Sequence, residues 1–135
     1  MSLFDKFKKN NKRNKEKAIE VITNILAAFH KKEYSKVLEY VDESEIDDLP
    51  SLFECIDETL KENGFDAIDE YGVPCNFHPK YEYSQLSVYE YADHSGFTVD
   101  YEMTSNSELV DLTLQLKFLY TNSGFHIILL NVEPQ

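Results

Sequence analysis

The sequence predicts an α+β fold in which three N-terminal helices pack on one face of a curved, four-stranded antiparallel meander sheet. The spacing of apolar residues predicts it: they recur every three or four positions in the first half of the chain and every second position in the last third. Hydrophobic residues make up 42% of the sequence, which is enough for one core. A chain of 135 residues is too short for two ordinary domains. We therefore expect a single domain over residues 16–135, preceded by a basic, frayed segment over residues 1–15.

Three helices are expected before residue 65. The first begins at Glu16 and ends near His30, where positive charge favours the negative end of the helix dipole. The second covers residues 34–41. The third is capped by Asp48 and ends at Gly64, because glycine adopts the left-handed backbone that closes a helix.

Four strands are expected over residues 83–91, 97–103, 109–120 and 125–132, and the short turns between them make all neighbours antiparallel. Matching the apolar faces pairs Phe118 with Ile127 and Leu116 with Leu129. The face toward the helices then carries Phe97, Val99, Tyr101, Leu112, Leu114, Leu116, Phe118, Ile127 and Leu129.

The opposite face has an acidic end, which consists of Asp100, Glu102, Asp111 and Thr113. In one register Glu102 and Asp111 lie directly opposite each other, which is destabilising unless a basic partner relieves the repulsion. We interpret this end as a binding surface for a basic protein, or alternatively as an ordinary solvated face.

The other end of that face is apolar, with Leu119, Ile128, Leu130 and Val132. An uncovered apolar patch on a sheet indicates a partner. The two interpretations are a homodimer face and a patch covered by the terminal segment or an unrecognised helix.

The net charge of −12 is unevenly distributed: residues 1–40 carry ten Lys or Arg against five Asp or Glu, and residues 41–135 carry three against twenty. Because residues 41–135 are strongly acidic, they repel nucleic acid, and we expect no nucleic-acid partner. No apolar run is long enough for an integral membrane segment, and Cys55 and Cys75 match no disulfide scaffold. These features predict a cytoplasmic protein.

No cofactor or metal site is expected. The four histidines are scattered, and no nucleophile signature or glycine-rich phosphate loop is present. Tyr101 is a pocket candidate for acid/base chemistry, assisted by Tyr71 or Tyr81 and by a carboxylate from Asp66 or Asp69. The alternative is that Tyr101 belongs to the core, and the sequence favours the absence of enzyme activity.

Two segments, AAFHKKEYSKVLEYVD and LYTNSGFHIILLNVEP, resemble the nuclear-transport-factor-2-like superfamily, also called cystatin-like. Gly124 and Phe125 stand where many members have Gly-Lys-Trp, and this chain has no Trp. More narrowly, DEYGVP followed by FTVDYEMTSNSELVDLTLQLKF looks like a family of small uncharacterised bacterial domains. The resemblance implies a fold and no mechanism, because the superfamily contains both enzymes and binding modules.

The function we expect is that of a non-enzymatic protein-binding module of a bacterium, of immunity or regulatory type, that captures a basic protein. The alternative is a small-ligand carrier or an acid/base pocket enzyme of the nuclear-transport-factor-2-like fold. In a third interpretation, the basic segment over residues 1–15 anchors the acidic body to a membrane surface.

Overall fold

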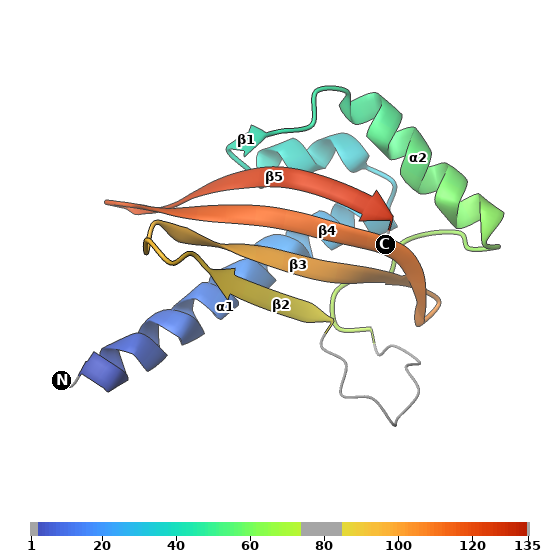
Figure 1. Ribbon diagram of the computed structural model, residues 1–135. Coiled ribbons are helices and arrows are strands. Elements are labelled where there is room, and N and C mark those ends of the chain that lie inside the picture. Colours follow the sequence, from blue (N-terminus) through green and yellow to red (C-terminus); the bar gives the residue numbers. More distant parts are fainter. Residues whose placement is uncertain (1–2, 74–84, 135) are drawn as a thin grey trace.

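The computed structural model describes residues 3–73 and 85–134 and shows an α+β fold (Figure 1). Its helical elements are α1 (Leu3–His30), the 3₁₀ helix η1 (Tyr34–Glu39) and α2 (Leu49–Glu62). Its strands are β1 (Glu43–Ser44), β2 (Leu86–Glu90), β3 (Gly96–Ser105), β4 (Glu108–Thr121) and β5 (Gly124–Pro134). Tyr83, where the first strand was predicted to begin, lies outside the described residues.

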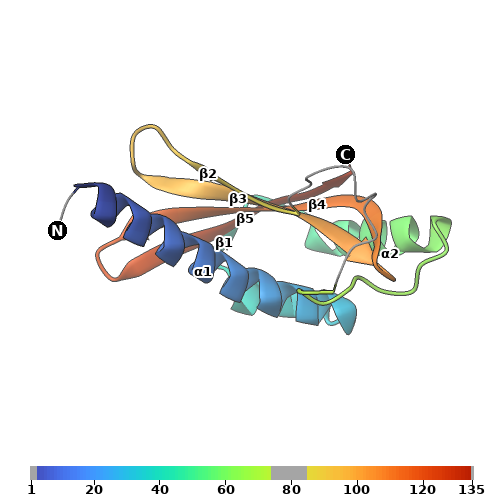
Figure 2. The ribbon, with the colours of Figure 1, turned by 90° about the horizontal axis from the view of Figure 1, so that it is seen from below.

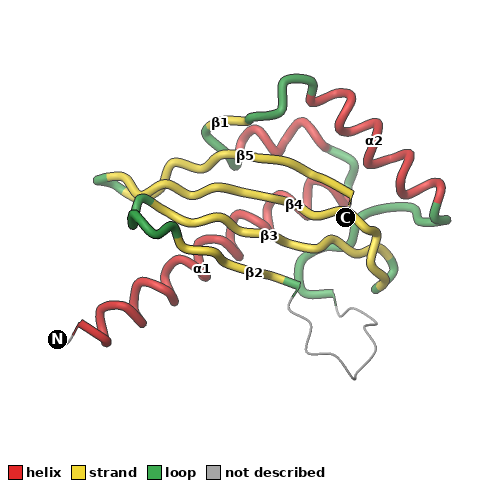
Figure 3. The backbone as a smooth tube through the Cα atoms, viewed as in Figure 1, coloured by secondary structure: helices red, strands yellow, loops and turns green. Residues whose placement is uncertain are grey.

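The sheet is five-stranded and mixed, in the order β1-β5-β4-β3-β2 (Figure 3). The predicted four-stranded antiparallel sheet is therefore wrong, because β1 adds a strand that runs parallel to β5. The amide of Asp42 donates to the carbonyl of Ile127 at 2.7 Å, and the amide of Glu45 donates to that of Leu129 at 2.9 Å. A strand of two residues is too short to leave an alternating pattern in the sequence.

The helical layer also differs from the prediction. Within the described residues, α1 and α2 are the only α-helices, and the predicted second helix is the six-residue 3₁₀ helix η1. Helix α1 begins at Leu3 rather than Glu16 and runs along one side of the sheet (Figure 2). The predicted division between a frayed segment and the domain stays a prediction.

Both predicted ends of α2 are confirmed. The Asp48 carboxylate accepts hydrogen bonds from the Ser51 amide at 3.2 Å and the Ser51 hydroxyl at 2.7 Å, and these bonds lower the pKa of Asp48. Gly64, with φ +76°, closes the helix. Ile56 and Leu60 carry α2 into the core.

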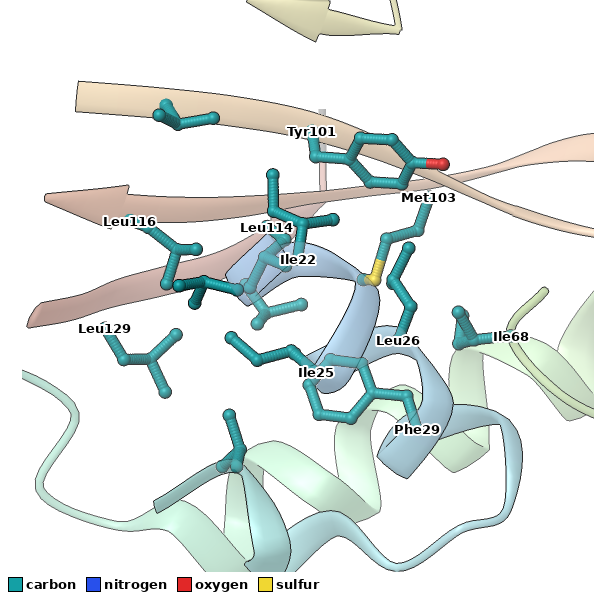
Figure 4. Packing of buried hydrophobic residues seen from close by; sticks show 14 of the residues in the cluster. Ile22, Ile25, Leu26, Phe29, Ile68, Tyr101, Met103, Leu114, Leu116 and Leu129 are labelled. Atoms are coloured by element: carbon teal, nitrogen blue, oxygen red, sulfur yellow. The ribbon is translucent and has the colours of Figure 1, made fainter. Parts of the chain in front are cut away.

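The predicted pairing of the central strands is confirmed, with Phe118 opposite Ile127 and Leu116 opposite Leu129. All nine residues predicted on the helix-facing side are buried. Figure 4 shows how side chains of α1, including Ile22 and Ile25, meet those of the sheet in one hydrophobic cluster. This helix-facing layer fixes the sheet and leaves its opposite side as the surface to consider.

Two irregularities shift the register at the far ends of the strands. Between Glu102 and Thr104, the single residue Met103 of β3 faces three residues of β4, which centre on Asp111 at φ +66°. In β5, the register shifts by one residue at Leu130, which lies between the partners of Leu116 and Gln115. The shift in β5 reverses the face on which the following side chains lie, whereas the shift between β3 and β4 spans two extra residues and keeps Val110 and Leu112 in the helix-facing cluster.

Candidate functional site

The candidate site is the outer face of the sheet, meaning the face opposite the helices. In the described part of the chain, α1 and α2 lie on the other side and do not cover it (Figure 2). Strand alternation places the following side chains on it: Glu43, Tyr89, Thr98, Asp100, Glu102, Thr113, Gln115, Lys117, Leu119, His126 and Ile128. We call this set the outer face.

The acidic end of the outer face unites three of the four predicted residues. Glu102 lies opposite Thr113, which is 6% exposed, and Asp100 lies opposite Gln115. The Gln115 amide donates to the Asp100 carboxylate at 3.2 Å. Both acids are half-buried, so their charges are partly shielded from water and more strongly felt by a docked group than fully solvated charges are.

Asp111 does not belong to this cluster in the way the sequence predicted. The exposed residue lies in the three-residue irregularity of β4, and Thr113 takes the place opposite Glu102. The predicted clash between Glu102 and Asp111 is therefore absent, because the irregularity moves Asp111 out of the ladder.

Beside the acidic end lies a hydroxyl-rich area. The Tyr91 and Thr98 hydroxyls form a hydrogen bond with each other. The Lys117 ammonium lies 5.5 Å from the centroid of the Tyr91 ring, a cation–π contact. This contact places the ammonium of Lys117 over an aromatic ring.

The apolar end of the outer face contains Leu119 and Ile128, with Leu130 next to them at the register shift, but not Val132. Ile128 is 6% exposed, and Leu119 and Leu130 are half-buried. Val132 pairs with Leu114 and belongs to the helix-facing cluster, so its predicted place on the dimer face is wrong. The reason is the extra residue at Leu130, which reverses the alternation beyond it.

The sequence did not predict a further pair of acids, Asp42 and Glu43, at the edge where β1 joins β5. The Glu43 carboxylate lies 3.0 Å from the His126 ring nitrogen Nε2, and the Asp42 carboxylate lies 4.0 Å from Nδ1. Asp42 also accepts a hydrogen bond from the Ile127 amide at 2.7 Å. The sequence shows that residues 42–62 are acidic, with nine Asp or Glu and one Lys, but nothing in it places Glu43 beside His126.

Tyr101 lies at the margin of the core. It is 3% exposed, belongs to the hydrophobic cluster, and its ring centroid is 5.7 Å from that of Tyr71. Figure 4 shows its hydroxyl directed away from the aliphatic side chains around Ile22 and Leu26. Tyr81, the other predicted helper, lies outside the described residues.

The carboxylates proposed to work with Tyr101 have other surroundings. Asp69 organises the turn between β3 and β4, accepting hydrogen bonds from the amides of Asn106 and Ser107 and from the hydroxyl of Thr104, at 2.8–3.1 Å. Asp66 lines a hollow of about 450 Å³ together with Lys32 and Asp57. Neither arrangement is that of an acid/base pair with a tyrosine.

Within residues 3–73 and 85–134 there is no group of three His, Cys, Asp or Glu that could hold a metal ion. His78 and Cys75 lie outside the described residues. Among the described helices, none is long and apolar enough to cross a membrane.

Comparison with known proteins places the chain in a family. Residues 26–135 match the family described as Domain of unknown function (DUF7668), and the chain belongs to it. No curated protein and no solved structure matches the chain. The match supports the narrower resemblance to an uncharacterised family, whereas no nuclear-transport-factor-2-like or cystatin-like family is confirmed.

Proposed function

We propose that this protein is a non-enzymatic protein-binding module that captures a basic protein on the outer face of its sheet. The proposal rests on one observation: the described helices do not cover this face, which has half-buried acids at one end and aliphatic side chains at the other. A face with both characters suits a protein partner, because apolar contact supplies affinity and charge supplies orientation.

The charge of the whole body supports a basic partner in particular. Residues 41–135 carry twenty acids against three Lys or Arg, so the attraction extends beyond the outer face. Such complementarity accelerates encounter and suppresses wrong partners. An immunity-type or regulatory role fits, and an acidic immunity protein against a basic nuclease is its sharpest form. A bacterial, cytoplasmic setting is part of the same proposal.

The alternative function, a small-ligand carrier or an acid/base pocket enzyme, has no described observation in its favour. Tyr101 packs in the hydrophobic cluster, and Asp69 is occupied by the turn of β3 and β4. A hollow of about 600 Å³ lies elsewhere, beside Arg13 and Phe125.

The test compares capture of proteins from the native host by three immobilised full-length chains. The first is the wild type, and the second is Asp100→Asn/Glu102→Gln, which removes two outer-face charges while keeping the side-chain shapes. The third, Glu54→Gln/Glu58→Gln, removes two charges from exposed positions of α2. We expect a basic protein to bind the first and third chains and to bind the second about tenfold more weakly.

The captured protein is then purified and titrated against all three chains at low and high salt. Equal affinity for the wild type and the outer-face variant would contradict the proposal, as would loss of binding only in the α2 variant. Failure of the wild type to bind any basic protein would contradict it as well.

A further inference from the structure

We infer that one basic partner of the outer face is a second copy of this chain, which docks through the N-terminal half of α1. This inference rests on the proposed function, since it names a partner for the same surface. We call residues 3–17 of α1 the basic arm. The sequence gives the arm seven Lys or Arg, against the two acids Asp5 and Glu16.

The arm is continuous with the part of α1 that packs on the core, and it is attached at Arg13 and Asn14. Asn14 is 3% exposed, and its amide donates to the Glu90 carboxylate at 2.8 Å and to the Tyr120 hydroxyl oxygen at 2.7 Å. The Tyr120 hydroxyl itself donates to Glu90 at 2.6 Å. The Arg13 guanidinium lies 5.5 Å from the centroid of the Phe125 ring. These contacts hold α1 against the end of the sheet and fix its direction.

Beyond this attachment, the helix runs past the sheet, and the N-terminal end of α1 stands clear of the strands (Figure 1). Among the lysines of the arm whose side chains are described, Lys12 and Lys15 are exposed and Lys17 is half-buried. The recorded ion pairs of its described side chains, Lys12 with Glu16 and Lys17 with Glu20, stay within α1. The charges of Lys12 and Lys15 therefore lie where another molecule can reach them.

The arm has no route to the outer face of its own chain. Helix α1 lies on the opposite side of the sheet, and a continuous helix fixed at Asn14 does not bend around the sheet edge (Figure 2). The complementary charges of the arm and the outer face meet only between two molecules. Because the two surfaces differ, the contact is head-to-tail, and it closes into a pair if each arm reaches the other body.

Charge also separates a second copy from the polyanions that a basic helix attracts. Residues 41–135 carry a net charge of −17, which repels a nucleic acid or an anionic membrane as the arm approaches it. The same charge repels the body of another copy but attracts its arm, whose N-terminal end stands clear of the strands. The half-buried Asp100 and Glu102 offer the arm anions at defined positions, beside the aliphatic end that extends the contact.

The experiment measures the mass of the full chain by light scattering, at about 0.01 M and about 1 M salt, where the screening length falls from about 30 Å to about 3 Å. We expect association at low salt and single chains at high salt. Two charge-reversed chains follow, Lys12→Glu/Lys15→Glu in the arm and Asp100→Lys/Glu102→Lys on the outer face. Each is expected to weaken self-association at least about tenfold.

A mixture of the two reversed chains sharpens the test. The intact arm of one variant can then bind the intact outer face of the other, and the reversed arm can bind the reversed outer face. We expect the mixture to associate where neither variant does alone. If Asp100→Lys/Glu102→Lys does not fold, as judged by its thermal transition, Asp100→Asn/Glu102→Gln replaces it in the self-association measurement. The control Glu54→Gln/Glu58→Gln is expected to associate as the wild type does.

The outcomes separate this inference from the proposed function. A wild type that stays single at low salt overturns the inference, while the outer face can still pass its own test with a different basic protein. Association that depends on the arm but not on Asp100 and Glu102 overturns the inference too, because the arm then docks elsewhere. Arm-dependent binding to vesicles of phosphatidylserine by a chain that stays single replaces it with a membrane contact.

Discussion

The two faces of the sheet share their strands but differ in what lies against them. On the helix-facing side, Leu116 and Phe118 are fully buried in a cluster that includes α1 and α2. On the outer face, their neighbours Gln115 and Leu119 are only half-buried. The difference teaches that one side of each strand holds the fold together, which leaves the other side free to vary in chemistry for a partner.

The largest expected effect comes from making the same substitution on both faces of β4. Leu116→Ala leaves a cavity in the helix-facing cluster and should lower the free energy of unfolding by about 3–5 kcal/mol. Leu119→Ala on the outer face should lower it by less than about 1.5 kcal/mol, because its surroundings already include solvent. Urea unfolding of the two variants and the wild type measures both values.

Both variants lose the same side chain and the same strand propensity, so each serves as the control for the other. Equal losses would contradict the division between the faces and would indicate that the outer face is covered as tightly as the core. A loss near zero for Leu116→Ala would contradict the packing of the cluster itself.

The second comparison concerns amides, one on each side of the sheet. Asn14→Ala removes two hydrogen bonds from a site that is 3% exposed and should cost about 1–3 kcal/mol of unfolding free energy. Gln115→Ala removes one hydrogen bond, to the half-buried Asp100, and should cost less than about 1 kcal/mol. Thermal unfolding gives both costs, and hydrogen exchange of the α1 amides should accelerate only in the Asn14 variant.

Asn24→Ala is the matched control for this substitution, since Asn24 lies on the exposed side of the same helix. It changes helix propensity equally and should be neutral or slightly stabilising. If Asn14→Ala behaved like Asn24→Ala, the attachment of the basic arm through Glu90 and Tyr120 would be wrong.

The sequence predicts the middle of the sheet well because alternation there is uninterrupted. Phe97, Leu116 and Leu129 are placed on the correct face by the two-residue period alone. The prediction fails for Val132, since an extra residue at Leu130 leaves no mark in hydrophobicity while reversing every later position. It fails for β1 because the hydrogen bonds of Asp42 and Glu45 with β5 join residues more than eighty positions apart.

The candidate site follows the same rule. Asp100, Glu102 and Thr113 are predicted together because they lie on regular parts of β3 and β4. Asp111 is misplaced by the irregularity beside it, at a position whose backbone has φ +66°. The contact of Glu43 with His126 could not be predicted, since it depends on a parallel pairing that nothing local specifies. Local periodicity therefore predicts surfaces, and irregularities decide their edges.

The smallest expected effect is that of a hydroxyl on the helical side. Tyr34 of η1 donates a hydrogen bond to the Asp57 carboxylate of α2, and burial, with this carboxylate as the next cause, raises the pKa of Tyr34. At neutral pH, Tyr34→Phe should cost about 1 kcal/mol, whereas Tyr91→Phe on the outer face should cost less. Urea unfolding at pH 7 compares the two.

The raised pKa of Tyr34 means that its contribution to stability decreases at alkaline pH. Above about pH 10 the unfolded chain loses the phenol proton, while the folded chain keeps it because its pKa is raised. The stabilisation from Tyr34 is thus complete below pH 10 and falls by up to about 1.4 kcal/mol for each pH unit above it. The other tyrosines contribute equally to both chains, so the difference between wild type and Tyr34→Phe reports Tyr34 alone. Because this difference is about 1 kcal/mol at neutral pH, the two stability curves should converge by about pH 11. Curves that stay parallel would show that the helical side does not hold this phenol more tightly than the unfolded chain does.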